Sequence, residues 1–248
     1  MSTITSSQPA SKLKQLPLLR LAFRPFFLLA ALFSIASLLV WLAFWHGNIL
    51  LRPYGGLVFW HQHEMLFGFA AAVVGGFLLT AVRNWTGLPS LSGAPLLGLV
   101  VLWLLGRVLM AFPMDLPGWL LLAVDLAFLP MVAIVMARLV ITAKRWRNLI
   151  FIPVLLLFAV ANLAMHLGVI QGDAELIRQA AYLAVLLITL MMTVVGGRVI
   201  AMFTANRLGR TKPVPIPLLE GVTLVSTAGV VVLQLVIMLG VAIPALLM

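Results

Sequence analysis

The sequence predicts an all-α protein, a polytopic transmembrane bundle of about seven helices. Of its 248 residues, 64% are hydrophobic and only 9% are Asp, Glu, Lys or Arg. A soluble domain carries roughly 25% charged residues, so this chain cannot cover a water-facing surface with charge. Its apolar runs are unbroken and reach the roughly 20 residues that a helix needs to cross a bilayer. A transmembrane β-barrel would instead show alternation in segments of about ten residues.

Turn-forming residues divide the chain into its elements. Residues 1–24 are polar and basic and are expected to form a cytoplasmic tail, because no convincing signal-peptide cleavage site follows them. Gly, Pro, Asn and Asp gather at 47–48, 52–53, 86–95, 115–118, 171–173 and 212–217. The transmembrane domain is therefore expected over 25–248, with helices at about 26–46, 58–82, 94–112, 118–141, 149–170, 177–204 and 216–246.

Positive charge predicts the orientation. The formal net charge is +10, from 16 basic and 6 acidic residues. With the N-terminus in the cytoplasm, only Arg52 and Arg178 fall in outer loops, and Arg107 and Arg198 fall within helices. The inner segments then hold Lys12, Lys14, Arg20, Arg24, Arg83, Arg138, Lys144, Arg145, Arg147, Arg207, Arg210 and Lys212. This bias follows the positive-inside rule, so the excess charge needs no nucleic-acid partner, and seven spans leave the C-terminus outside.

The four histidines are expected at one depth, near the outer face. His46 ends the first helix, His61 and His63 open the second, and His166 lies in the last turns of the fifth. The chain has no cysteine, so a metal or haem would need His, Met, carboxylate or backbone oxygen ligands. Two interpretations stay open: a shared cofactor site, or interfacial rings that simply reach water.

His61 is the preferred cofactor ligand on the second helix. His61 and His63 point roughly 200° apart on a helix. The side of His61 continues through Glu64, Met65 and the small residues Gly68, Ala72 and Gly75, along which a flat ring or a neighbouring helix can approach closely. Glu64 can orient a histidine ring as a second partner. The alternative is that this seam of small residues only packs helices.

Two further pairs of polar residues are expected inside the bundle. Asn162 and His166 are four residues apart and share a helix face. Arg107 and Asp125 lie nine residues either side of Leu116, which places them at equal depth in an antiparallel hairpin. We expect them to form an ion pair, because an unpaired charge at that depth is costly. Arg198, near the inner end of the sixth helix, is expected to reach the interface.

Two stretches of the chain resemble each other. Residues 73–80 (VVGGFLLT) resemble residues 194–201 (VVGGRVIA) at an offset of 121, and His46 matches His166 at 120. Both stretches lie on inward-running helices, so this similarity indicates a parallel repeat with a four-helix period.

Four motifs resemble those of the NnrS family over nearly the whole chain. They are Phe23-Arg24-Pro25-Phe26-Phe27-Leu28; Trp60-His61-Gln62-His63-Glu64-Met65-Leu66-Phe67-Gly68-Phe69; Gly76-Phe77-Leu78-Leu79-Thr80-Ala81-Val82 with Asn84-Trp85-Thr86-Gly87; and Gly197-Arg198-Val199-Ile200 with Phe203-Thr204 and Asn206. The resemblance implies a bacterial inner-membrane protein that contains haem and copper and helps cells withstand nitric oxide and nitrosative stress.

With this resemblance, His61 is expected to bind haem iron, with His63 as second candidate and Glu64 and Met65 beside them. His166 and His46 are expected to complete an iron or copper site near the outer face. The haem hypothesis requires His61 to face the bundle close to His166.

The resemblance has two departures. Members of the family usually continue for further helices with more His motifs, whereas this sequence stops at Met248, as a truncated member would. Ala201 replaces the Pro usual after the Gly-Arg-Val-Ile motif.

Other functions remain open. Arg107, Asp125, Asn162 and Gln234 would line the path of a transporter or channel. A structural subunit would pack against a further helical subunit or a second copy, within membrane lipids. The sequence leaves undecided whether the protein is an enzyme, a sensor or a protective protein.

Overall fold

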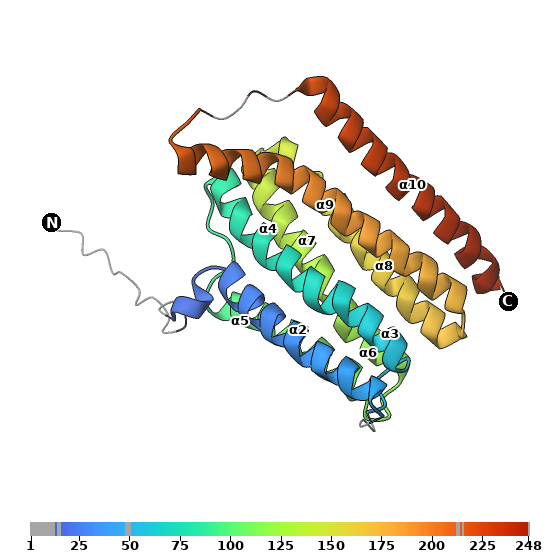
Figure 1. Ribbon diagram of the computed structural model, residues 1–248. Coiled ribbons are helices and arrows are strands. Elements are labelled where there is room, and N and C mark those ends of the chain that lie inside the picture. Colours follow the sequence, from blue (N-terminus) through green and yellow to red (C-terminus); the bar gives the residue numbers. More distant parts are fainter. Residues whose placement is uncertain (1–12, 14–15, 48–50, 212–213, 215, 248) are drawn as a thin grey trace.

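The computed structural model describes residues 13, 16–47, 51–211, 214 and 216–247, and this part of the chain holds helices and no strand (Figure 1). Seven helical stretches are long and apolar enough to cross a membrane. The predicted all-α class and the predicted number of spans are confirmed. Most of the expected tail at 1–24, including Lys12 and Lys14, lies outside the described residues, as does Lys212.

The spans are built from nine α-helices and one π-helical segment within the described residues. The α-helices are α2 (Phe23–Trp45), α3 (Leu57–His63), α4 (Ala71–Thr86), α5 (Ala94–Ala111), α6 (Gly118–Leu126), α7 (Phe128–Thr142), α8 (Phe151–Gln171), α9 (Ala174–Leu208) and α10 (Pro217–Leu247). The π-helical segment η2 (Glu64–Ala70) joins α3 and α4 into one 30-residue span. Short 3-10 turns lie at η1 (Pro17–Leu19) and η3 (Trp146–Asn148).

Local chemistry explains where helices begin and break. The carboxylate of Asp173 accepts a hydrogen bond from the Leu176 amide at 2.9 Å, so α9 starts earlier than expected, on a regular N-cap. The fourth span divides into α6 and α7 at Ala127. Pro130 explains this break, because it has no N–H to donate to the carbonyl of Leu126.

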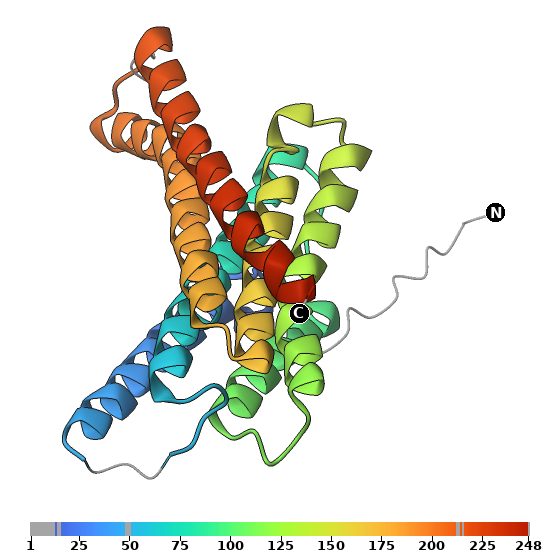
Figure 2. The ribbon, with the colours of Figure 1, turned by 90° about the vertical axis from the view of Figure 1, so that its right-hand side faces the viewer.

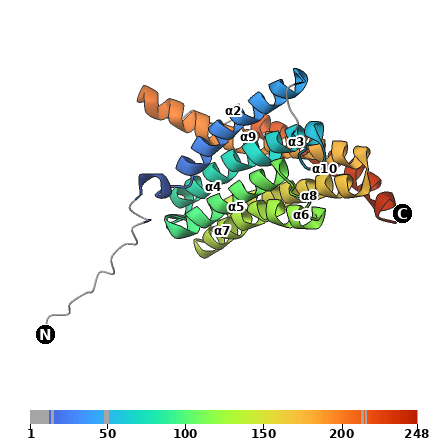
Figure 3. The same cartoon turned by 90° about the horizontal axis from the view of Figure 1, so that it is seen from below.

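The helices form a layered bundle. Helix α4 packs between α2 and α7, and α8 packs between α7 and α9 (Figures 1 and 3). Helix α10 packs mainly against α9 and stands apart from the rest of the bundle (Figure 2). Only 11% of its span is buried, against 56% for the spans that contain α4 and α8. The interior of the bundle therefore lies around α4, α7 and α8.

The seam of small residues packs neighbouring helices. A Cβ added at Gly75 would lie 3.1 Å from the Phe128 ring of α7, and one at Gly68 would lie 2.7 Å from the Phe33 ring of α2. No space for a flat ring remains along these positions, so the packing interpretation is the correct one. The parallel repeat stays a prediction, since Gly197 in the matching stretch of α9 has open space around it.

Candidate functional site

Six polar side chains from five helical segments meet inside the bundle. Each is at most 6% exposed. Arg107 lies four residues before the end of α5, and Asp125 lies seven residues after the start of α6. Both are roughly 6–10 Å from the helix ends that flank the α5–α6 turn, at about 1.5 Å per residue. The members of this polar cluster are His63, Glu64, Arg107, Asp125, Asn162 and His166.

Arg107 pairs with two carboxylates. Its Nη1 donates to Oε2 of Glu64 at 2.6 Å, and its Nη2 donates to Oδ1 of Asp125. The ion pair predicted from the symmetry of the hairpin is present. Gly106 makes the approach possible, because a Cβ there would lie 3.2 Å from Asp125 Oδ1. The second carboxylate, Glu64, was not expected as a partner of Arg107.

The side-chain amide of Asn162 shows which ring nitrogen of His63 carries a hydrogen. Its Nδ2 donates to Oδ2 of Asp125 at 2.7 Å, and its Oδ1 lies 2.8 Å from Nε2 of His63. A flipped amide would set its oxygen against the carboxylate, so the orientation is fixed by Asp125. His63 therefore donates from Nε2.

The other nitrogen of His63 also faces an acceptor. Nδ1 lies 3.2 Å from Oε1 of Glu64, and Nε2 lies 3.2 Å from Oδ2 of Asp125. An imidazolium, which carries both hydrogens, satisfies every one of these contacts. The two carboxylates are then balanced by Arg107 and His63, and the cluster is neutral in a region where a net charge would be expensive.

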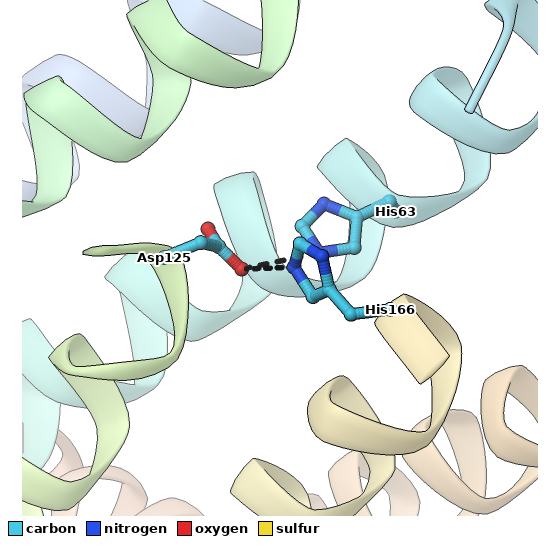
Figure 4. A group of neighbouring side chains, drawn as sticks. All are labelled: His63, Asp125 and His166. Atoms are coloured by element: carbon cyan, nitrogen blue, oxygen red, sulfur yellow. Dashed lines mark hydrogen bonds and ion pairs between the residues drawn. The ribbon is translucent and has the colours of Figure 1, made fainter. Parts of the chain in front are cut away.

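His166 completes a group that fits a metal ion. Its Nε2 lies 3.2 Å from Oδ2 of Asp125, and its Nδ1 is buried without a hydrogen-bond partner among the described residues. Figure 4 shows both imidazoles directed at the same carboxylate oxygen. Ligand atoms of His63, Asp125 and His166 lie within 4.8 Å of one another. Two imidazoles and a carboxylate suit Cu, Zn or Fe, and a bound cation would replace the proton of His63.

Aromatic rings enclose this group. The rings of Phe59 and Phe67 lie 5.5 and 5.1 Å from the ring of His63, and the ring of Tyr54 lies 5.4 Å from that of His166. Tyr54 sits between the first two spans, and burial raises the pKa of its hydroxyl. These rings pack around the two imidazoles, both of which are fully buried.

His61 lies on the other side of the same helix. Its ring stacks on Trp41 of α2, with centroids 4.1 Å apart and planes 10° apart, and its Nδ1 is buried without a hydrogen-bond partner among the described residues. His61, Met65 and Glu64 line a groove of about 400 Å³ against α2. Met65 is 55% exposed, so this groove opens sideways, at the surface of the bundle and away from its interior.

Glu64 belongs both to the groove beside His61 and to the polar cluster. It lines the groove beside His61 and also contacts His63 and Arg107 in the polar cluster. A group bound in the groove would thus lie next to a side chain of the cluster.

Of the four histidines that were expected at one depth, two come into contact. His63 and His166 meet, with ring centroids 5.2 Å apart. His46, at the C-cap of α2, is exposed and its Nδ1 bonds to the carbonyl of Leu42 in its own helix at 2.8 Å. His61 faces α2, so the preference for His61 over His63 as the residue directed into the bundle was wrong. The helix is rotated so that His63, Glu64, Phe67 and Gly68 face inward.

Asp125 and Asn162 as direct partners of the histidines were not predicted. The i, i+4 spacing of Asn162 and His166 predicted that they lie on the same face of a helix. Both side chains are buried. Gln234, a candidate for a transport path, instead donates to Oε1 of Gln179 at 2.7 Å, where α10 meets α9.

Fold and site together define a multi-pass α-helical membrane protein with a buried site of two imidazoles and one carboxylate. Residues 17–248 match the family described as NnrS protein. The chain belongs to the NnrS family, and the resemblance of its motifs is confirmed. No curated protein sequence and no solved structure is significantly similar to it.

Proposed function

We propose that this NnrS-family protein holds copper and haem in the inner membrane of a bacterium and acts in the response to nitric oxide and nitrosative stress. The observation that carries the proposal is the buried group of His63, Asp125 and His166 in a chain of this family. A copper ion or haem, when bound, supplies a centre that exchanges electrons or meets a small gas.

His63, Asp125 and His166 would hold the copper ion. Asn162 and Arg107 orient Asp125 from two sides, and partners of this kind set the geometry and affinity of metal ligands. Phe59, Phe67 and Tyr54 keep water away from the imidazoles. These contacts support a site that is preorganised by the chain itself.

The groove between α2 and the α3–η2 stretch would hold the haem. The expected closeness of His61 to His166 is not met, because His61 faces Trp41 of α2, so the haem would lie beside the polar cluster and not within it. His61 offers an imidazole there, Met65 a thioether, and Trp41 a flat aromatic wall. Histidine and methionine both serve as ligands of haem iron, so either side chain would supply one. Glu64 lines the groove and also contacts His63. A change in the charge of one site would therefore be felt at the other through this carboxylate.

Metal analysis and an absorption spectrum of the purified full chain test the proposal. We expect copper in the wild type and a Soret band after expression with ample haem. His63→Gln and His166→Gln should reduce bound copper to background, and His61→Ala should remove the Soret band.

His46→Gln is the matched control, because His46 is exposed and outside both sites. It should retain copper and haem. A wild type that holds neither copper nor haem would contradict the proposal, as would full retention of copper in both variants of the buried histidines.

A further inference from the structure

A second polar pocket lies at the end of the bundle opposite to the polar cluster. Lys144, Arg145 and Arg147 belong to the turn between α7 and α8, and Arg198 comes from α9. These four cations line one pocket of about 690 Å³, together with Trp85 and Trp146. Neither the cofactor groove nor the polar cluster shares a residue with it.

No carboxylate balances this charge. None of the six acidic residues, all of them within the described part of the chain, is among the residues that line the pocket. Arg147 and Arg198 line the same pocket, where their like charges are unfavourable to each other. An anion between them would relieve this repulsion, and the attraction would be stronger at a membrane surface than in bulk water.

Arg198 is held in place by uncharged groups. Its Nη1 donates to Oδ1 of Asn148 at 3.2 Å, and its Cζ lies 6.0 Å from the ring centroid of Phe151. Asn148 is 9% exposed, so the amide that orients the guanidinium is fixed in the fold. Among the described residues this guanidinium has no further acceptor, which leaves donors for a ligand. A planar guanidinium matches the oxygens of a phosphate group.

The walls of the pocket indicate the source of that phosphate. Trp146 is 60% exposed and Met202, which also lines the pocket, is 42% exposed. Trp146 lies in the turn between α7 and α8, and Met202 lies in the last two turns of α9. This is the level at which the headgroup region of a bilayer meets the protein, and Trp is typical of it. A dissolved anion would make no favourable contact with this apolar rim. The glycerol and the first methylenes of a lipid would pack against it.

We propose that this pocket binds the phosphate of an anionic phospholipid in the leaflet at that membrane face. Basic pockets between transmembrane helices are a known way to recognise such headgroups. The lipid would tie the α7–α8 turn to α9.

Native mass spectrometry of the full chain in detergent tests the proposal, with phosphatidylglycerol and phosphatidylcholine as the two probes. We expect the wild type to retain one phosphatidylglycerol and to bind it in clear preference to phosphatidylcholine. Lys144→Gln combined with Arg147→Gln should lower the affinity for phosphatidylglycerol roughly 30-fold, the effect of removing two surface cations. Both side chains are exposed, so the variant is expected to fold.

Arg207→Gln combined with Arg210→Gln is the matched control. It removes two exposed cations from the same end of the bundle but outside the pocket, and the affinity should stay nearly constant. Equal losses in the two double variants would overturn the proposal, since the cations would then act only as a general surface charge. Displacement of the lipid by millimolar inorganic phosphate would overturn it too, because the site would then take a free anion.

Discussion

At the residue scale, the polar cluster depends on charge balance. Arg107 and an imidazolium at His63 face the carboxylates of Glu64 and Asp125, and all four side chains are buried. Removing one partner of a buried ion pair leaves an uncompensated charge. The network should therefore respond to net charge more than to the loss of single contacts.

We expect Arg107→Gln to lower the free energy of unfolding by about 3–5 kcal/mol, because one negative charge is left unbalanced. Adding Glu64→Gln to this variant restores neutrality, with Asp125 facing His63. The double variant should therefore be more stable than Arg107→Gln alone. Unfolding in detergent, followed by circular dichroism, measures both.

Arg207→Gln is the control for loss of an arginine, since this side chain is exposed at the end of α9. It should leave stability almost unchanged. If Glu64→Gln further destabilised the Arg107→Gln protein, charge balance would not be what holds the cluster.

At the scale of elements, the π-helical segment η2 places the cluster. A π-helical turn inserts an extra residue into the helix and changes the direction of the side chains that follow. The carbonyl of Gly68 in this segment accepts a hydrogen bond from Nε1 of Trp103 in α5 at 3.0 Å. Gly68 thus brings η2 and α5 together at the level where Arg107 reaches Glu64.

Gly68→Ala should disturb this contact. The added Cβ would lie 2.5 Å from Oε2 of Glu64, 2.7 Å from Cε1 of Phe33 and 3.0 Å from Nη1 of Arg107. Overpacking of this kind costs about 1–3 kcal/mol, and we expect copper binding to weaken as Glu64 moves. Thermal unfolding and metal content measure the two effects.

Gly98→Ala provides the comparison within α5. A Cβ at Gly98 meets no atom within 4 Å, so stability should be unchanged or raised by up to about 1 kcal/mol. Equal behaviour of the two alanine variants would show that η2 and α5 are not in close contact at Gly68.

At the scale of the whole molecule, the distribution of charge predicts how the protein sits in the membrane. Arg52 lies between the first two spans, at the end where α5 meets α6 and α8 meets α9. Arg210 follows α9 at the other end, with the turn of Lys144 and Arg147. The positive-inside rule assigns the first end to the periplasm and the second to the cytoplasm.

Single cysteines can test this orientation without background, because the chain contains none. In spheroplasts, whose inner membrane is intact, Arg52→Cys should react with a membrane-impermeant thiol reagent. Arg210→Cys should react only after the membrane is opened. Both positions are exposed. The reverse pattern would refute the orientation, and the cysteine-free wild type controls for non-specific labelling.

The sequence by itself determined that the chain is a helical membrane protein with seven spans, and that Arg107 pairs with Asp125. These features are local. Each span is stabilised in lipid by its own apolar composition and its internal backbone hydrogen bonds, and a short turn at Leu116 fixes the depth of the two charges.

Only the tertiary structure decided which histidines meet. His61 and His63 point roughly 200° apart on a helix, so the rotation of the helix about its axis decides which of them faces inward. That rotation depends on η2 and on packing against α2, α5 and α9. The partners of His63 come from Asp125 and Asn162, 62 and 99 residues further along the chain. Hydropathy fixes the depth of a side chain, but contacts between helices fix the direction in which it points.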